Sequence, residues 1–301
     1  MSSIKSLSPN DLDPRSLHAF LLGGVAPRPI AFASTVDKDG RVNLAPFSYF
    51  NVFSANPPVL IFSPARRGKD NTTKHTLDNV LEVPEVVINM VNHSIVHACS
   101  LASTDYEKGV NEFEKAGLTE MPSETITPPR VKESPVSFEC KVLRVDSFGP
   151  NPGAGQLVVC EIQKMHFRED VLGDNGYPDA AKMDVVGRCG GNYYVRASKD
   201  ALFTVPKPLA NLGIGVDALP KDIRLSKVLT GNHLAMLGNV EMLPNETDVN
   251  DHKLMELSEI FMDYQDDGVT LELELHKFAA EQLNSGDVDG AWKTLLSFNL
   301  G

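Results

Sequence analysis

Residues 26–73 read APRPIAFASTVDKDGRVNLAPFSYFNVFSANPPVLIFSPARRGKDNTT, and this stretch predicts how the chain folds. Residues 30–36 are rich in β-branched and aromatic side chains, which favour a strand. The sequence DKDG at 37–40 is typical of a hairpin turn, because glycine adopts a positive φ without steric cost. Residues 41–50 are therefore predicted to return as a second strand, antiparallel to the first.

Four further segments complete a mainly β region. Residues 59–62 form a continuous apolar run after two prolines, which is typical of a strand buried on both faces. Residues 85–91, 136–148 and 156–167 are also predicted strands, and the last two are long enough to curl. Antiparallel strands with helices inserted between them, without a regular βαβ alternation, indicate a small closed barrel and not a parallel sheet.

Helical patterns are inserted between the strands and dominate the end of the chain. A helix at 15–22 is predicted because Asp13 can cap it and proline occupies its first position. We expect residues 1–205 to form the barrel domain and residues 206–301 to form a mainly helical extension packed on it. Trp292 is predicted to be a packing anchor in the last helix. The other predicted helices cover residues 73–82, 92–103, 108–116, 245–264, 270–283 and 287–296.

Composition and charge exclude several classes of protein. Of the 301 residues, 42% are hydrophobic and 23% are charged, as in soluble globular proteins. Apolar runs fall short of the roughly 20 residues that span a bilayer, and the polar start, MSSIKSLSPNDLDPRSL, lacks the apolar core of a secretory signal. We therefore expect a cytoplasmic protein without a membrane partner. A formal charge of −12 also argues against nucleic acid, which requires extended basic surfaces.

Common catalytic and metal-binding patterns are missing from the sequence. His93 and His97 have the spacing of metal ligands on a helix, but no third ligand lies at a telling distance, so we expect no metal. The glycine-rich segment 149–155 joins two strands instead of opening a helix, which excludes a dinucleotide fingerprint. Neither GxSxG nor a Walker motif is present. No CxxC pair occurs among the four cysteines, which are Cys99, Cys140, Cys160 and Cys189.

One short segment is basic within this acidic chain. We call residues 66–74 the basic loop, and its only acidic residue is Asp70. Arginine forks and the N–H groups at a helix start suit a terminal phosphate. Alternatively, the segment is a solvated loop, which is the usual state of a run of charges. The residues predicted to hold the anion are Ser63, Arg66, Arg67, Lys69, Thr72 and Thr73.

Polar residues also interrupt the strands that precede the basic loop. Ser34 and Thr35 lie in the first predicted strand, and residues 43–48 lie in the second. These side chains either satisfy one another across the hairpin or line a face that binds a ligand. The residues alone leave both possibilities open.

Several motifs in order carry a resemblance to a known family. They are PRPIAFASTVDKDGRVNLAPFSYFNVFSANPPVLIFS, then RRGKDNTTKHTL, a strand with Val86-Val87-Ile88-Asn89, and VVGRCGGNYYVR. Together they resemble the flavin reductase-like, FMN-binding split-barrel family, nearest the branch of the nitrilotriacetate monooxygenase reductase component and related flavoprotein oxygenases. The resemblance covers about residues 20–200. The later GIGVDALPKDIRLSKVLTGNHLAMLGNVEMLP resembles longer members of that branch, and the final helices have no functional pattern to transfer.

The resemblance implies a six-stranded antiparallel Greek-key barrel that forms a homodimer, with one FMN per subunit near the interface. It implies that Arg66 or Arg67, with Ser63, Lys69, Thr72 and Thr73, holds the FMN phosphate. The residues implied to lie near the rest of the flavin are Ser34, Thr35, Asn43, Ala45, Pro46, Ser48, Gly190, Gly191 and Tyr193.

The implied activity is that of an NAD(P)H:flavin oxidoreductase, in which hydride passes from nicotinamide to flavin. Such chemistry requires position and an open ring face and needs no catalytic acid or nucleophile, which agrees with the missing motifs. The electrons would go to a partner oxygenase, to oxygen or to another acceptor. Two alternatives stay open: an FMN electron carrier of the same fold reduced by a protein donor, and a non-enzymatic ligand-binding or assembly protein.

Overall fold

The structure is a computed structural model that describes residues 3–208 and 212–299. The chain divides into two compact units, Met1–Phe203 and Thr204–Gly301, which are described separately. Each helix in the described part of the chain is too short or too polar to cross a membrane.

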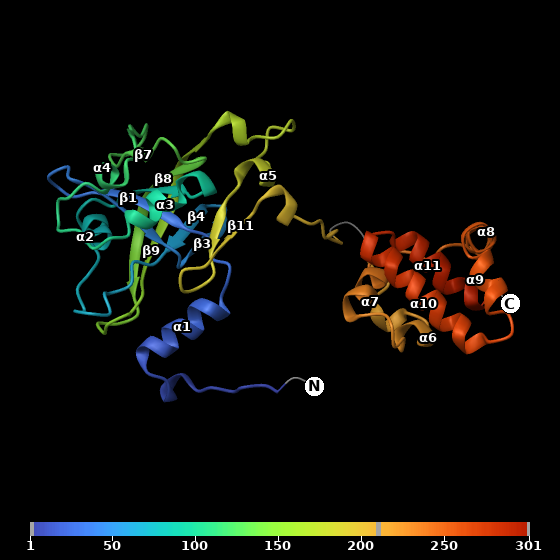
Figure 1. Ribbon diagram of the computed structural model, residues 1–301. Helices are drawn as coiled ribbons and strands as arrows, with labels where there is room; N and C mark the ends of the chain where they lie inside the picture. The colour runs from blue at the N-terminus through green and yellow to red at the C-terminus, as the bar shows by residue number, and fades with distance from the viewer. Residues whose placement is uncertain (1–2, 209–211, 300–301) are drawn as a thin grey trace. The chain divides into compact units, whose positions relative to one another are not determined.

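The first unit is built on one antiparallel sheet of seven strands (Figure 1), in the order β2-β1-β5-β8-β9-β4-β3. The mainly β fold with inserted helices is confirmed, although the sheet has seven strands where six were expected. Strand β4 pairs with β9, and Val59 lies opposite Glu161. The strands are β1 Ala31–Val36, β2 Val42–Phe47, β3 Phe50–Ala55, β4 Pro58–Phe62, β5 Glu85–Met90, β8 Val136–Ser147 and β9 Gln156–Phe167.

The two edges of this sheet meet at one corner. Strands β2 and β3 are the outermost strands, yet only Ser48 and Tyr49 separate them in the chain. The sheet must therefore curl until its edges approach, which gives a split barrel. The single strand predicted at 41–50 is wrong for the same reason, because the chain leaves one edge after Phe47 and joins the other at Phe50.

Alternating residues of β1 build two cores. Ala31 and Ala33 point into the barrel, where they pack with residues such as Phe62. Phe32 points to the other face and packs against a second layer that includes Phe113. Helix α2 (His75–Glu82) contributes to the first core, and α3 (Val96–Leu101) and α4 (Glu112–Ala116) cover the second. Every residue of β1 is buried as a result.

The remaining elements of this unit are short. Helix α1 spans Pro14–Gly24, and the Asp13 carboxylate caps it by accepting hydrogen bonds from the backbone N–H groups of Arg15 and Ser16, at 3.0 and 3.1 Å. This confirms the predicted cap. The others are β6 Glu120–Met121, β7 Arg130–Val131, α5 Ala180–Met183, β10 Val186–Arg188 and β11 Tyr194–Arg196, with 3₁₀ turns at Pro9–Asp11, His93–Ile95, Glu169–Val171 and Lys199–Ala201.

The second unit is helical. Trp292 is buried in its core, and its indole N–H donates to the carbonyl oxygen of Leu237 at 3.0 Å, which confirms its predicted packing role. The helix predicted at 245–264 divides at Leu257 into two. The helices are α6 Lys221–Arg224, α7 Gly231–Gly238, α8 Glu246–Glu256, α9 Ser258–Asp263, α10 Gly268–Ser285 and α11 Val288–Leu296, with 3₁₀ turns at Val216–Ala218 and Ser297–Asn299.

Candidate functional site

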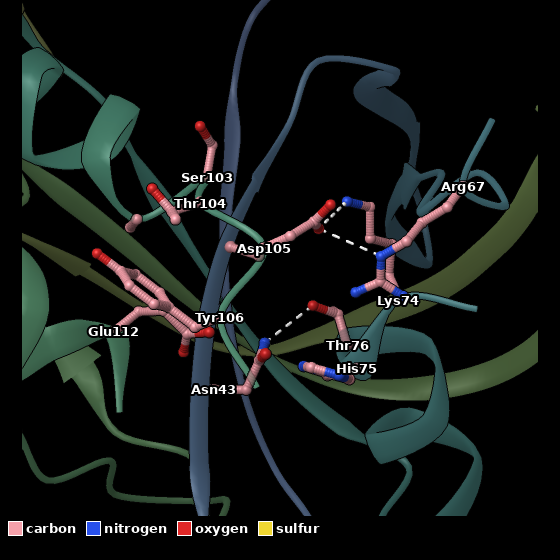
Figure 2. Close-up of a pocket in the computed structure, with 12 residues that line it drawn as sticks. Asn43, Arg67, Lys74, His75, Thr76, Ser103, Thr104, Asp105, Tyr106 and Glu112 are labelled. Carbon is pink, nitrogen blue, oxygen red and sulfur yellow. Dashed lines mark hydrogen bonds and ion pairs between the residues drawn. The ribbon is translucent and has the colours of Figure 1, made fainter. Parts of the chain in front are cut away.

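Three cations of the basic loop converge on one carboxylate. Lys74 Nζ, Lys69 Nζ and Arg67 Nε lie 2.9, 3.1 and 3.2 Å from the Asp105 carboxylate. Figure 2 shows Asp105 reaching toward Arg67 and Lys74 from the loop after α3. The hydrogen bond from Lys74, reinforced by those from Lys69 and Arg67, holds the pKa of Asp105 well below its usual range despite partial burial.

The structure separates the two adjacent arginines. Arg67 lines a pocket with Lys74, whereas Arg66 turns away and its Nε donates to Asn71 Oδ1 at 2.8 Å. Arg66 lines a different cavity, beside Tyr49 and the 151–153 segment. Arg67 is therefore the arginine that belongs to the convergent cation cluster.

The two threonines of the basic loop bond to nearby acids. Thr72 Oγ1 donates to Asp70 and Thr73 Oγ1 donates to Asp78, each at 2.7 Å. These contacts hold the loop against the start of α2. The hydroxyls thus serve the shape of the loop in this structure.

The pocket beside Arg67 is small, about 30 Å³, and most of the residues that line it have polar side chains. Asn43 and Ala45 line it from β2, and Asn43 Nδ2 donates to Thr76 Oγ1 at 2.9 Å (Figure 2). Glu112 closes another side, where its Oε2 accepts from the backbone N–H of Leu44 at 2.9 Å. Burial raises the pKa of Glu112.

A larger hollow of about 340 Å³ adjoins this pocket, because Ser103 lines both. Pro46 and Ser48 line it from the end of β2. Arg188 lies opposite on the β10–β11 hairpin, with its guanidinium 4.6 Å from the centre of the Tyr194 ring. We call this space the inner hollow, and its volume lies within the range of about 300–1,000 Å³ for small-molecule sites.

Ser34, Thr35 and Ser63 lie outside these spaces. Ser34 and Thr35 are completely buried because β1 is covered on both faces. Thr35 Oγ1 accepts from Asn79 Nδ2 at 3.1 Å, and Ser34 Oγ has no hydrogen-bond partner among the described residues. Ser63 Oγ accepts from the backbone N–H of Gln156 at 3.0 Å, which ties β4 to β9.

The late glycine motif forms the turn of the β10–β11 hairpin. Gly190 has a φ of +88°, and a Cβ there would lie 3.3 Å from the carbonyl oxygen of Leu22, so a larger residue is strained and crowded. Gly191 also has a positive φ, and Tyr193 is 78% exposed. This turn stands beside the inner hollow and places Arg188 there.

Sequence reasoning missed Asp105 and Arg188 as site residues. Asp105 is 31 residues or more from each of its cations in the chain, and no local pattern reports such a contact. Arg188 lies within the VVGRCGGNYYVR motif, which is one of the motifs that carry the family resemblance, so its position in this motif could have identified it.

The residues present fit a phosphorylated ring cofactor. The three cations face two carboxylates, because Asp70 also interacts with Lys69 and Arg67. The cluster therefore keeps an excess of positive charge, which favours an anion such as a phosphate. The inner hollow offers the hydroxyls of Ser48 and Ser103 to the polar edge of a flat ring.

Comparisons with known proteins agree with this chemistry. A family model described as a flavin reductase like domain matches residues 23–181. An uncharacterized protein of Aquifex aeolicus is 40% identical over 188 residues, which are 62% of this chain and 93% of that protein.

Two solved structures share both fold and sequence with the chain. Nitrilotriacetate monooxygenase component B from Bacillus cereus is 29% identical with a TM-score of 0.63, and the match covers 68% of this chain and all of that one. The 2-nitrobenzoate 2-nitroreductase of Pseudomonas fluorescens is 29% identical with a TM-score of 0.60, over 69% of this chain and all of that one. The family match ends at residue 181, before the helical unit begins.

Proposed function

The chain belongs to the flavin reductase-like family, and from this premise we propose that it is an FMN-dependent NAD(P)H:flavin oxidoreductase. Its split-barrel fold and its relatives support a flavin-binding role. The proposal adds FMN as the flavin, NADH or NADPH as the donor, and a partner oxygenase or another acceptor for the electrons. It also includes a homodimer with the flavin near the interface, a cytoplasmic location, and a helical extension packed on the barrel.

The observation that carries the proposal is the convergence of Arg67, Lys69 and Lys74 on Asp105. Gathering three cations from positions 67–74 is electrostatically costly without anions, and Asp105 and Asp70 together carry one charge fewer than the cations. The proposed phosphate offsets the remaining positive charge. The inner hollow adjoins the pocket beside Arg67 through Ser103, so a molecule whose phosphate binds at the cation cluster can extend its ring toward the inner hollow.

When bound, FMN supplies a ring that accepts hydride directly, so the chemistry needs no protein nucleophile. The chain binds and orients the two reactants. Arg67, Lys69 and Lys74 hold the phosphate, and Ser48 and Ser103 lie where they can donate hydrogen bonds to a ring edge. Donors fixed before the reaction stabilise negative charge on that edge without reorganising.

The first test is spectroscopic and kinetic. The purified protein is mixed with FMN and either NADH or NADPH, and loss of the nicotinamide absorbance band is followed. We expect oxidation well above the enzyme-free rate with at least one donor. A yellow protein with tightly held FMN but no oxidation of either donor would instead favour the electron carrier, and a protein that does not bind FMN would favour the non-enzymatic alternative.

The second test uses the two adjacent arginines as a matched pair. Arg67→Gln should weaken FMN binding by about tenfold, because a charge-assisted hydrogen bond to phosphate is worth about 1.5–3 kcal/mol. Arg66→Gln is the control, because its guanidinium bonds to Asn71 and not to the cation cluster. Quenching of flavin fluorescence gives the dissociation constants. If both variants and the unaltered protein have equal dissociation constants for FMN, the basic loop is a solvated loop that does not bind the phosphate.

A further inference from the structure

A second hollow continues outward from the inner one. We call it the outer hollow; its volume is about 510 Å³. It shares Ser100, Arg188, Asn192 and Tyr194 with the inner hollow, so the two form one continuous groove. Its other lining residues come from the 93–97 segment and from β11, and they include His93, His97, Tyr193 and Arg196.

The lining of the outer hollow is cationic in an acidic protein. Two arginines line it, and no carboxylate occurs among its described lining residues, although the chain carries a formal charge of −12. Arg196 is neutralised by Asp184, to which it donates two hydrogen bonds of 2.7 and 2.9 Å. Arg188 differs from Arg196 in the groups that surround its guanidinium.

The guanidinium of Arg188 has no acidic partner in the described part of the chain. Its Nη2 donates to the carbonyl oxygen of Gly191 at 2.9 Å, and its planar group lies 4.6 Å from the Tyr194 ring centre. Stacking on an aromatic ring orients a guanidinium and leaves its other N–H groups for an anion. The positive charge at the junction of the two hollows is therefore uncompensated.

Exposed tyrosines stand beside this charge. Tyr193 is 78% exposed and Tyr194 is 37% exposed, and both line the outer hollow. Aromatic side chains stack on nucleobases, and arginines bind phosphates, so the combination matches a phosphorylated nucleoside. An apolar ligand would leave the guanidinium unpaired, and an acidic peptide would leave the two rings without a planar partner.

We propose that the outer hollow binds the adenosine-phosphate half of the nicotinamide dinucleotide, with Arg188 on a phosphate and Tyr193 or Tyr194 against the adenine. This inference rests on the proposed reductase function and adds a subsite to it. Because the groove is continuous, a dinucleotide held there directs its nicotinamide end into the inner hollow, where the flavin ring is proposed to lie. The phosphate on Arg188 is either the pyrophosphate, common to NADH and NADPH, or the 2′-phosphate of NADPH.

The test measures nucleotide binding by calorimetry on the full chain with saturating FMN, so that the phosphate site of the basic loop is filled. The probes are ADP and adenosine 2′,5′-diphosphate. We expect a measurable dissociation constant for at least one of them, raised roughly tenfold by Arg188→Gln. If adenosine 2′,5′-diphosphate binds more tightly than ADP, Arg188 contacts the 2′-phosphate. If the two probes bind equally, Arg188 contacts the phosphates on the 5′ side.

Arg144→Gln is the matched control. Arg144 lies on β8, is exposed, and pairs with Asp146 at 2.8 Å, so its loss removes the same charge from the protein away from the lining of the groove. Its dissociation constants should equal those of the unaltered protein. Equal effects of Arg144→Gln and Arg188→Gln, or no binding of either probe at millimolar concentration, would overturn the proposal.

A kinetic comparison separates this inference from the proposed function. Reduced nicotinamide mononucleotide lacks the adenosine half, so Arg188→Gln should raise the KM for the dinucleotide about tenfold more than the KM for the mononucleotide. An equal rise for both donors overturns the subsite while the reductase function stands. If neither donor is oxidised by the unaltered protein, the reductase function fails, and the calorimetric result still decides the subsite.

Discussion

Replacing Asp105 by asparagine should tighten FMN binding. The substitution keeps the size of the side chain and one oxygen acceptor but removes the charge that Arg67, Lys69 and Lys74 now share. The net charge around this point rises by one positive charge. A phosphate that approaches these cations no longer meets a carboxylate held by the same groups.

The size of the effect follows from the exposure of the cluster. The Asp105 side chain is 38% exposed, so its ion pairs resemble surface pairs. Two unit charges roughly 4 Å apart interact by about 1 kcal/mol in bulk water and more strongly near a protein surface. Removing a carboxylate beside a phosphate dianion should therefore gain at least about 2 kcal/mol, or about thirtyfold in affinity. The lost ion pairs should lower the free energy of unfolding by only about 1 kcal/mol.

The assay is a fluorescence titration of FMN against Asp105→Asn and the unaltered protein, with Asp146→Asn as the control. Asp146 is an exposed carboxylate that pairs with Arg144 alone, so its loss should leave the dissociation constant unchanged. Because the pKa of Asp105 is lowered, its carboxylate stays ionised throughout the neutral pH range. The difference in affinity should therefore be constant above about pH 7 and become smaller at roughly pH 6, where the phosphate takes up a proton. Weaker FMN binding by Asp105→Asn would refute the reasoning and show that the carboxylate positions the cations.

Three other predictions concern the stability of the two units. Glu139→Ala should lower the free energy of unfolding in urea by about 2 kcal/mol, because the partly buried backbone N–H groups of Glu124 and Thr125 lose a charged acceptor. Burial opposes ionisation of Glu139, but hydrogen bonds led by that from Thr125 Oγ1 outweigh it and hold its pKa at about 2, so this stabilisation is present above pH 4.5 and is lost as the pH falls toward 2. Trp292→Ala should cost about 3–5 kcal/mol in the helical unit, measured by circular dichroism, and leave FMN binding unchanged. A chain that ends at Phe203 should remain folded and bind FMN, measured by gel filtration and absorbance.

Each of these has an outcome that contradicts it. An acid-unfolding midpoint unchanged by Glu139→Ala would show that the hydrogen bonds to this carboxylate contribute little. Loss of FMN from the Trp292→Ala protein would mean that the helical unit supports the site. Aggregation of the chain that ends at Phe203 would mean that the barrel does not fold alone.

Local signals in the sequence predicted the elements well. The strand predicted at 156–167 is β9 as observed, and Asp13 caps α1 through the interactions that its position suggested. The turn at 37–40 uses a positive φ at Gly40, as expected. Such features depend on neighbours in the chain, which the sequence displays directly. The break at Ser48 and Tyr49 was missed because it depends on which strands lie at the sheet edges.

The candidate site was only partly predictable. Positions 43–48 and the basic loop were found because polar and basic residues are unusual there, and the structure places Asn43, Ala45 and Arg67 around one pocket. The sequence could not reveal the environment of Thr35, because a polar residue in a strand looks the same whether it faces a ligand or bonds inside the core. In the structure Thr35 accepts a hydrogen bond from Asn79. Asp105 could not be predicted as a site residue, because it is far from Arg67, Lys69 and Lys74 along the chain.

The pairing of β4 with β9 has a consequence for how the protein folds during its synthesis on the ribosome. Val59 and its partner Glu161 are about a hundred residues apart, so at 5–20 residues per second the second strand is made roughly 5–20 s after the first. During that interval one edge of β4, with Leu60 and Phe62, has no partner. An open apolar edge is a template for association with other chains. The edge of β4 can be covered only after β9 has been synthesised. The time of synthesis of β9, and not the speed of local folding, therefore determines how long the nascent barrel is prone to aggregation.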